Sequence, residues 1–150
     1  MSLVSLGAVF IAVGAWITVP FLVPFTMQTF SVFLLLFVFG GKIGCSSIFL
    51  YIGLGMVGIP VFSGGGSGIS ALYGATGGYI IGFALAGCAY LALQSIFIKY
   101  QSGELWLSFV LLALCYACGT LWYTLVYANN SVGILAALSY CVLPYVLPDV

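Results

Sequence analysis

The chain has 150 residues, of which 65% are hydrophobic and 3% are charged. A soluble domain carries about 25% charged residues and about 45–50% apolar residues, so this composition cannot supply a water-facing surface. The charged residues are Lys42, Lys99, Glu104 and Asp149, and they form no basic patch that could bind nucleic acid. We therefore expect an all-α polytopic membrane protein that lies in a lipid bilayer.

Apolar runs predict the spans in chain order. A helix needs about 20 apolar residues to cross the bilayer, and shorter runs borrow flanking residues. The predicted spans are about 3–18, 26–39, 43–57, 77–98 and 105–128, and a shorter apolar run follows at 132–147. The first run lacks the basic segment of a secretory signal, so we expect it to be retained. All of 1–150 is assigned to a single transmembrane domain.

Two lysines predict the orientation of these spans. Lys42 follows the second span and Lys99 follows the fourth, and alternate connections lie on the same side of a membrane. The positive-inside rule makes that side cytoplasmic. The amino terminus is then inside, and the connections at Pro20–Phe25, Gly58–Thr76 and Asn129–Ser131 are outside, where a ligand would arrive.

The stretch from Gly58 to Tyr79, GIPVFSGGGSGISALYGATGGY, is a long glycine-rich interruption between two spans. Irregular backbone is tolerated at membrane depth only when it is buried in protein or lines a cavity. Loops longer than about 12–15 residues are usually functional or disordered. The stretch is therefore either part of a ligand site or a plain connector outside the membrane.

Polar and aromatic side chains gather in the predicted outer segments. Ligand pockets are mostly apolar with a few placed polar groups, and glycines let backbone amides approach a ligand. The candidate substrate-binding residues are Phe25, Gln28, Ser63, Gly65, Gly66, Ser67, Tyr73, Tyr79 and Asp149. Three alternatives stay open: a hydrogen bond between helices for Gln28, the interfacial aromatic belt for the tyrosines, and a solvated tail position for Asp149.

The chain offers little for catalysis. General acid–base chemistry needs titratable groups within reach of one another, and a Ser/His/Asp arrangement is impossible without histidine. Cys115 and Cys118 have C-x-x-C spacing, but they lie inside a predicted span without a second pair. We interpret the cysteines as packing residues, and we expect no enzyme, no cofactor and no metal site.

Two stripes of small residues predict close helix contacts. The longer stripe recurs every four residues, at Gly74, Gly78, Gly82 and Ala86. Such a face lets a neighbouring backbone approach, and we interpret it as packing within the protein. Ala8 and Ala12 form a shorter stripe on the first span.

Four segments carry a family resemblance. Residues 19–44 contain VPFTMQT followed by a Gly-Gly-Lys turn, and residues 58–83 contain GIPVFSGG and GATGGY. Residues 119–123 and 142–149 add GTLWY and VLPYVLPD. From about residue 7 onward the chain resembles the BioY family, the substrate-binding (S) components of energy-coupling-factor biotin transporters.

The resemblance implies a six-helix S-component fold in the bacterial cytoplasmic membrane, with biotin bound near the outer face. Polar groups of Gln28, the Ser63–Ser70 loop and Asp149 would then orient the ligand. The resemblance also implies that Ala8 and Ala12 dock on the transmembrane coupling subunit. ATP would be hydrolysed by partner subunits, because this chain has no phosphate-binding loop of the G-x-x-x-x-G-K-[ST] kind.

The chain also departs from the family pattern. Ala75 stands where the family usually has proline, and Pro148 stands where glycine usually precedes the aspartate. The family layout makes 132–147 a short outer helix, although hydropathy alone predicts a short sixth span there. It starts the last span near Asp149, so we expect that helix to be truncated at Val150, without the lysine that follows the aspartate.

Two rival functions remain. The chain could be an S component for another small vitamin, which a panel of vitamins competing with labelled biotin would reveal. It could also be a non-transport membrane assembly subunit, in which the glycine stripes serve only helix contact or self-association. The second rival predicts no saturable ligand, so substitutions in the Ser63–Ser70 loop would be silent.

Overall fold

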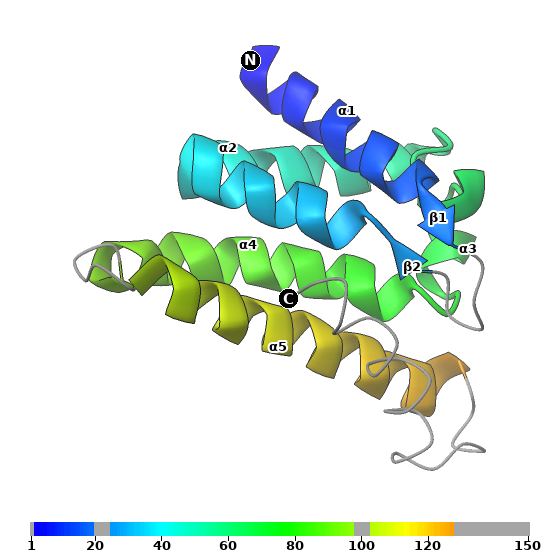
Figure 1. Ribbon diagram of the computed structural model, residues 1–150. Coiled ribbons are helices and arrows are strands. Elements are labelled where there is room, and N and C mark those ends of the chain that lie inside the picture. The colour runs from blue at the N-terminus through cyan, green and yellow to red at the C-terminus, as the bar shows by residue number, and fades with distance from the viewer. Residues whose placement is uncertain (1, 20–24, 98–102, 128–150) are drawn as a thin grey trace.

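The computed structural model describes residues 2–19, 25–97 and 103–127. The expected outer helix at 132–147 and the start of a last span at Asp149 lie outside these residues. The long helices are α1 (Ser2–Trp16), α2 (Gln28–Val57), α4 (Gly77–Phe97) and α5 (Gly103–Trp122). The short elements are β1 (Thr18–Val19), β2 (Phe25–Thr26), the 3₁₀ turn η1 (Ser63–Gly65), α3 (Ile69–Leu72) and the π turn η2 (Tyr123–Tyr127). Figure 1 shows the long helices side by side.

Helix α2 consists of two antiparallel halves. Gly40, inside α2, has a φ of 79° and a ψ of 164°, which are not helical. The Gln28 side-chain amide donates a hydrogen bond of 3.1 Å to the Tyr51 hydroxyl. A straight helix would separate these two residues by roughly 35 Å at 1.5 Å per residue, so the chain must fold back between them, as Figure 1 shows. The fold-back coincides with the break expected at Gly40-Gly41-Lys42.

The turn of α2 is fastened to the carboxyl end of α4. The Gly41 backbone N–H donates a hydrogen bond of 3.3 Å to Oε1 of Gln94. The rings of Phe37 and Tyr90 meet edge to face at 5.3 Å between centroids. The α2 turn and the end of α4 therefore lie at one end of the molecule, and β1, β2, α3 and the beginning of α4 lie at the other (Figure 1).

Replacing Gly40 with alanine is expected to destabilise the protein through the backbone alone. Its dihedral angles fall in a region that essentially only glycine adopts, and a strained residue costs about 1–3 kcal/mol. A Cβ at this position would meet nothing within 4 Å, so no steric clash adds to the cost. The melting temperature of the detergent-purified Gly40→Ala protein should fall. Equal melting temperatures for Gly40→Ala and for Gly53→Ala, a helical site with open space around it, would contradict this expectation.

Helix α1 packs on α2 through glycines and alanines. Its buried residues are Gly7, Ala8, Ile11, Ala12, Gly14 and Ala15. A Cβ at Gly7 would overlap Ser47, and a Cβ at Gly14 would overlap Ser31 and lie 3.0 Å from the Met27 carbonyl oxygen. Helix α1 therefore lies against both halves of α2, at the close distance that small residues permit.

Helices α4 and α5 meet along the predicted glycine stripe. A Cβ at Gly78 would lie 2.8 Å from the Cys118 carbonyl oxygen, and one at Gly82 would lie 3.2 Å from the Cys115 Cα atom. Ala86 is fully buried. Gly74 lies before α4, and a Cβ there would meet only the nearby Ala71 backbone within 4 Å. The stripe therefore serves helix packing from Gly78 to Ala86, as interpreted from the sequence, but not at Gly74.

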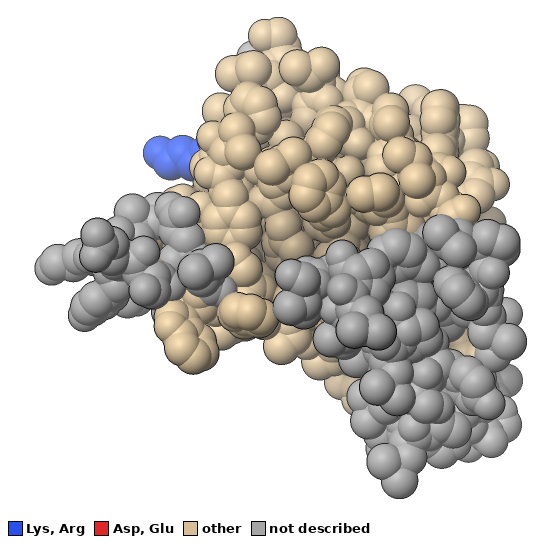
Figure 2. All heavy atoms as spheres, in the orientation of Figure 1, with Lys and Arg blue, Asp and Glu red and all other residues tan. Residues whose placement is uncertain are grey.

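The exterior of the described residues is apolar. Three described segments have the length and apolar composition of membrane spans, namely Gly77–Ser95, Trp106–Leu125 and Gln28–Val57, the last of which is counted across its fold-back at Gly40. Figure 2 shows a face on which the described surface lacks charge except at one edge. Such a surface suits lipid rather than water, and the all-helical membrane fold expected from the sequence is confirmed. The small β1–β2 pair is an addition that the sequence did not predict.

Candidate functional site

The irregular segments come together at the end of the molecule opposite the α2 turn (Figure 1). Strands β1 and β2 pair there in antiparallel fashion, with Thr18 opposite Thr26 and Val19 opposite Phe25. The beginning of α2, the η1 turn, α3 and the beginning of α4 lie at the same end. Phe25 thus has a described backbone position in β2, whereas its side chain and the whole of Asp149 lie outside what the structure describes.

The buried side chains beneath this end are Gln28, Tyr51 and Phe62. Gln28 is 4% exposed and bonds to the Tyr51 hydroxyl. The Tyr51 ring packs edge to face on Phe62 at 5.5 Å between centroids. The Phe62 ring, which is 1% exposed, occupies the space that a side chain at Gly55 would need. Gln28 therefore makes a hydrogen bond between the two halves of α2, and a ligand contact by the same amide stays a prediction.

The glycine-rich segment is a tightly hydrogen-bonded loop. The Phe62 N–H donates to the Gly66 carbonyl at 3.0 Å, and the Gly68 N–H donates to the Gly55 carbonyl at 2.7 Å. Gly64, Gly65 and Gly68 have positive φ values between 66° and 79°, a conformation that glycine adopts without a steric penalty. Gly65 and Gly66 thus shape a compact turn beside the half-buried Ser67.

Ser63 is the polar group of this loop that lacks a protein partner. Among the described residues, its Oγ atom is the buried side-chain oxygen or nitrogen that makes no hydrogen bond. An unsatisfied buried hydroxyl costs about 1–3 kcal/mol, and native proteins contain few such groups. A ligand that bonded this hydroxyl would remove that cost, but it would reach the buried oxygen only after the loop moves.

Two tyrosines of the predicted set lie at the same end but face α5. Tyr73 is exposed, and its ring centroid lies 6.3 Å from that of Trp122. The Tyr79 ring packs edge to face on Tyr116 and lies against Gly119. Tyr79 thus lies between α4 and α5. The aromatic-belt interpretation of both tyrosines stays open.

Sequence reasoning missed several residues that build this end. The indole N–H of Trp16 donates to the Pro60 carbonyl at 3.0 Å, and that of Trp122 donates to the Gly74 carbonyl at 3.2 Å. Tyr51 and Phe62 belong to the hydrophobic core beneath this end. Trp122 lies in the GTLWY segment and could have been included, whereas Tyr51 sits in an apolar run that gives no such signal.

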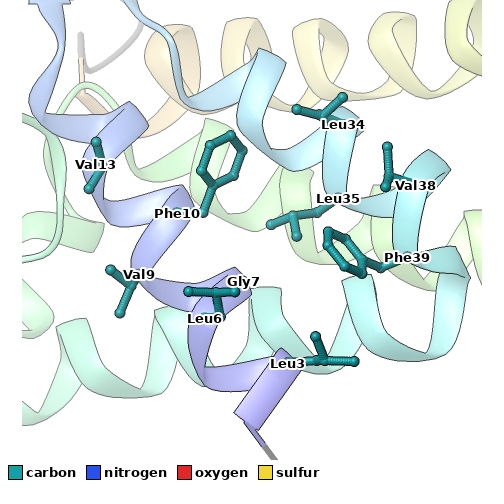
Figure 3. A pocket seen from close by; sticks show the side chains of 10 residues that line it. All are labelled: Leu3, Leu6, Gly7, Val9, Phe10, Val13, Leu34, Leu35, Val38 and Phe39. Carbon is teal, nitrogen blue, oxygen red and sulfur yellow. The ribbon is translucent and has the colours of Figure 1, made fainter.

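A concave region elsewhere in the molecule is a mainly apolar groove between α1 and the first half of α2. It has a volume of about 430 Å³ and is lined by Leu3, Leu6, Gly7, Val9, Phe10, Val13, Leu34, Leu35, Val38 and Phe39. Figure 3 shows only carbon in the side chains that line it. A ligand with polar groups would find no hydrogen-bond partner there, so the groove suits an acyl chain or an apolar helix. The loop end is therefore the better candidate for a small polar ligand.

The predicted docking residues Ala8 and Ala12 lie on the buried face of α1, and their contact with a partner stays a prediction. Ala8 and Ala12 are 2% and 7% exposed, because they face α2. A partner cannot reach these two side chains in this conformation. The exposed face of α1 consists instead of large apolar residues, namely Leu3, Leu6, Val9, Phe10, Val13 and Trp16. The alanine spacing identified a contact face of α1, but the neighbour that covers it is α2.

The fold is similar to that of a solved S-component of an ECF-type transporter. A crystal structure described as the S-component for biotin from an ECF-type ABC transporter superposes with a TM-score of 0.85. The alignment covers 99% of this chain and 81% of that one, at 22% identity. At that identity the likeness shows the fold alone. The family follows from the sequence: the BioY family model matches residues 1–150, and the chain belongs to the BioY family.

Named relatives agree with this assignment. The probable biotin transporter BioY of Pyrococcus horikoshii is 38% identical over 152 residues, which cover 100% of this chain and 86% of that protein. The biotin transporter BioY of Thermotoga maritima is 49% identical over 76 residues, 50% of this chain and 45% of that protein. The biotin transporter BioY2 of Lactococcus lactis is 43% identical over 88 residues, 58% and 48% of the two chains. The family is thus one of transporters, which implies a role without catalysis in a multi-pass membrane protein.

Proposed function

We propose that this chain is the biotin-binding S component of an energy-coupling-factor transporter and that it serves the uptake of biotin. The observation that carries the proposal is the BioY family match, which extends over residues 1–150. The relative from Pyrococcus horikoshii, with 38% identity over the whole chain, supports the same ligand. The chain then needs no catalysis of its own, because ATP hydrolysis belongs to partner subunits.

Biotin is proposed to bind at the loop end. Its ureido ring and carboxylate need hydrogen-bond partners, and its thiophane ring and valeryl chain need apolar surface. The open hydroxyl of Ser63 and the backbone around Gly65, Gly66 and Ser67 offer polar groups. Gln28 begins α2, Tyr73 follows α3 and Tyr79 lies near the beginning of α4, and these parts of the elements lie at the same end. Phe25 and Asp149 complete the proposed set on the strength of the family resemblance.

The proposed orientation places the loop end outside and the amino terminus inside. Lys42 lies at the α2 turn, opposite the loop end, and the positive-inside rule favours the cytoplasm for it. The coupling subunit is proposed to dock on the exposed apolar face of α1 beside the groove, rather than on Ala8 and Ala12 themselves. Self-association through that face is the alternative.

Equilibrium binding of labelled biotin to the detergent-purified chain tests this function. Saturable binding that unlabelled biotin displaces is the expected result. Displacement by a different vitamin at lower concentration would show that the ligand is another vitamin. No saturable binding of any member of the panel would favour the assembly subunit.

Ser63→Ala separates a ligand contact from a structural role. Because the hydroxyl has no partner in the protein, its removal should leave the melting temperature of the empty chain unchanged or raise it. Loss of one hydrogen bond to biotin should raise the dissociation constant about three- to tenfold. Ser70→Ala, at an exposed position of the same loop, is the control and should change neither quantity. Unchanged affinity in the Ser63 variant would remove this residue from the site.

A further inference from the structure

The Trp16 side chain makes a hydrogen bond from the carboxyl end of α1 to the base of the glycine-rich loop, beside the packing of α1 on η1. The indole N–H of Trp16 donates to the Pro60 carbonyl oxygen at 3.0 Å, across 44 positions of sequence. Trp16 is nevertheless 58% exposed. The small residues of α1, and not this indole, hold the helix against α2. The bond therefore contributes little to the packing of α1. Its main effect is on the position of the loop that contains Pro60.

Pro60 fixes the position of the residues that follow it. The Val61 N–H donates to the Ile59 carbonyl at 2.8 Å, which closes a tight turn around Pro60. Val61 and Phe62 then enter the core, with exposed fractions of 8% and 1%. Ser63, which bears the unpartnered hydroxyl, comes next. The Pro60 carbonyl thus lies three residues before the unpartnered Ser63 hydroxyl, with the buried Phe62 between them.

We propose that Trp16 is a positioning residue for ligand retention: its indole holds the base of the loop, so that Ser63 and the turn after it stay in place over bound ligand. The proposal rests on the proposed function, because it concerns the same site. Trp122 makes a comparable bond at the other end of the loop, to Gly74. That indole is half-buried and packs against Gly77 and Gly78, so it also holds α4 and α5 together. Trp16 is 58% exposed, and within the described residues its side-chain hydrogen bond is the one to Pro60.

Trp16→Phe tests the proposal with little change in shape. Phenylalanine keeps an aromatic ring but lacks the N–H donor. One exposed hydrogen bond is expected to change the loop equilibrium about three- to tenfold. Labelled biotin should therefore dissociate about three- to tenfold faster from the variant in a chase experiment. The association rate should stay within about twofold and the melting temperature of the empty protein should not change, because the fold does not depend on this bond.

Trp106→Phe is the matched control, because Trp106 is also exposed, at 66%, and lies on α5. An effect that any exposed tryptophan at the membrane surface would cause should appear in both variants. An unchanged dissociation rate in the Trp16 variant, or the same change in the Trp106 variant, would overturn the proposal. A lower melting temperature of the empty Trp16 variant would also overturn it, because Trp16 would then hold the fold. Absence of biotin binding to the unmodified chain would instead refute the proposed function, so the two failures are distinguishable.

Discussion

Gly55→Ala is expected to weaken biotin binding at least tenfold and to lower the melting temperature. A Cβ at Gly55 would overlap the Phe62 ring and lie 2.5 Å from its Cε1 and Cε2 atoms. The ring cannot move aside, because it is buried and packs on Tyr51. Overpacking of a filled core costs about 1–3 kcal/mol, and expulsion of Phe62 would move the adjoining Ser63. Thermal unfolding and equilibrium binding of the purified variant measure the two effects.

Gly53→Ala is the matched control for this variant. Gly53 lies two residues earlier in the same helix, and a Cβ there would meet nothing within 4 Å. Alanine has a better helix propensity than glycine by about 1 kcal/mol, so the control should be as stable as the unmodified chain or more so. Equal affinities in the two variants would show that the Phe62 anchor does not position the binding loop.

The sequence predicted those features of the fold that depend on neighbouring residues. The Gly-Gly-Lys break marked the turn of α2, because glycine at position 40 adopts dihedral angles that a helix does not permit. The four-residue spacing from Gly78 to Ala86 marked a contact face, because residues four apart lie on one side of a helix. The interruption after Val57 marked the loop end, because irregular backbone is excluded from lipid.

Features that depend on contacts across the chain were not predictable. The Gln28–Tyr51 hydrogen bond joins the two halves of a hairpin, and hydropathy does not say which residues of two spans face each other. Phe62 lies inside a glycine-rich loop, yet it is buried, because Gly55 leaves space for its ring. Ala8 and Ala12 show the same limit, since a spacing identifies a face of a helix and not the neighbour that covers it.

The loop end and the α1–α2 groove offer a transport subunit two surfaces of different chemistry. The loop end combines an open hydroxyl with glycine backbone and aromatic rings, which suits a small ligand with polar groups. The groove beside α1 is lined by side chains that contain only carbon (Figure 3), which suits lipid or a partner helix. Trp16 lies where these two surfaces approach, on the exposed face of α1 and bonded to the loop.

Gly78→Val is expected to destabilise the protein by about 3 kcal/mol, because it separates α4 from α5. A Cβ at Gly78 would overlap the Trp122 Cβ atom and lie 2.8 Å from the Cys118 carbonyl oxygen. Neither neighbour can yield without movement of the α5 backbone. Helices in a membrane associate largely through close packing and hydrogen bonds, so lost contact is not recovered by a hydrophobic effect. The midpoint of unfolding in mixed detergent measures the change.

Gly53→Val is the matched control, because a Cβ at Gly53 has open space around it. It has the low helix propensity of valine without the steric overlap, so the difference between the two variants measures the packing effect. The Gly78 variant should also lose the Trp122 bond to the Gly74 carbonyl, since any shift of α5 carries the indole away. Biotin binding should then weaken together with stability, unlike in the Trp16 variant, where retention alone changes. Equal unfolding midpoints for the two valine variants would show that α4 and α5 do not depend on this close approach.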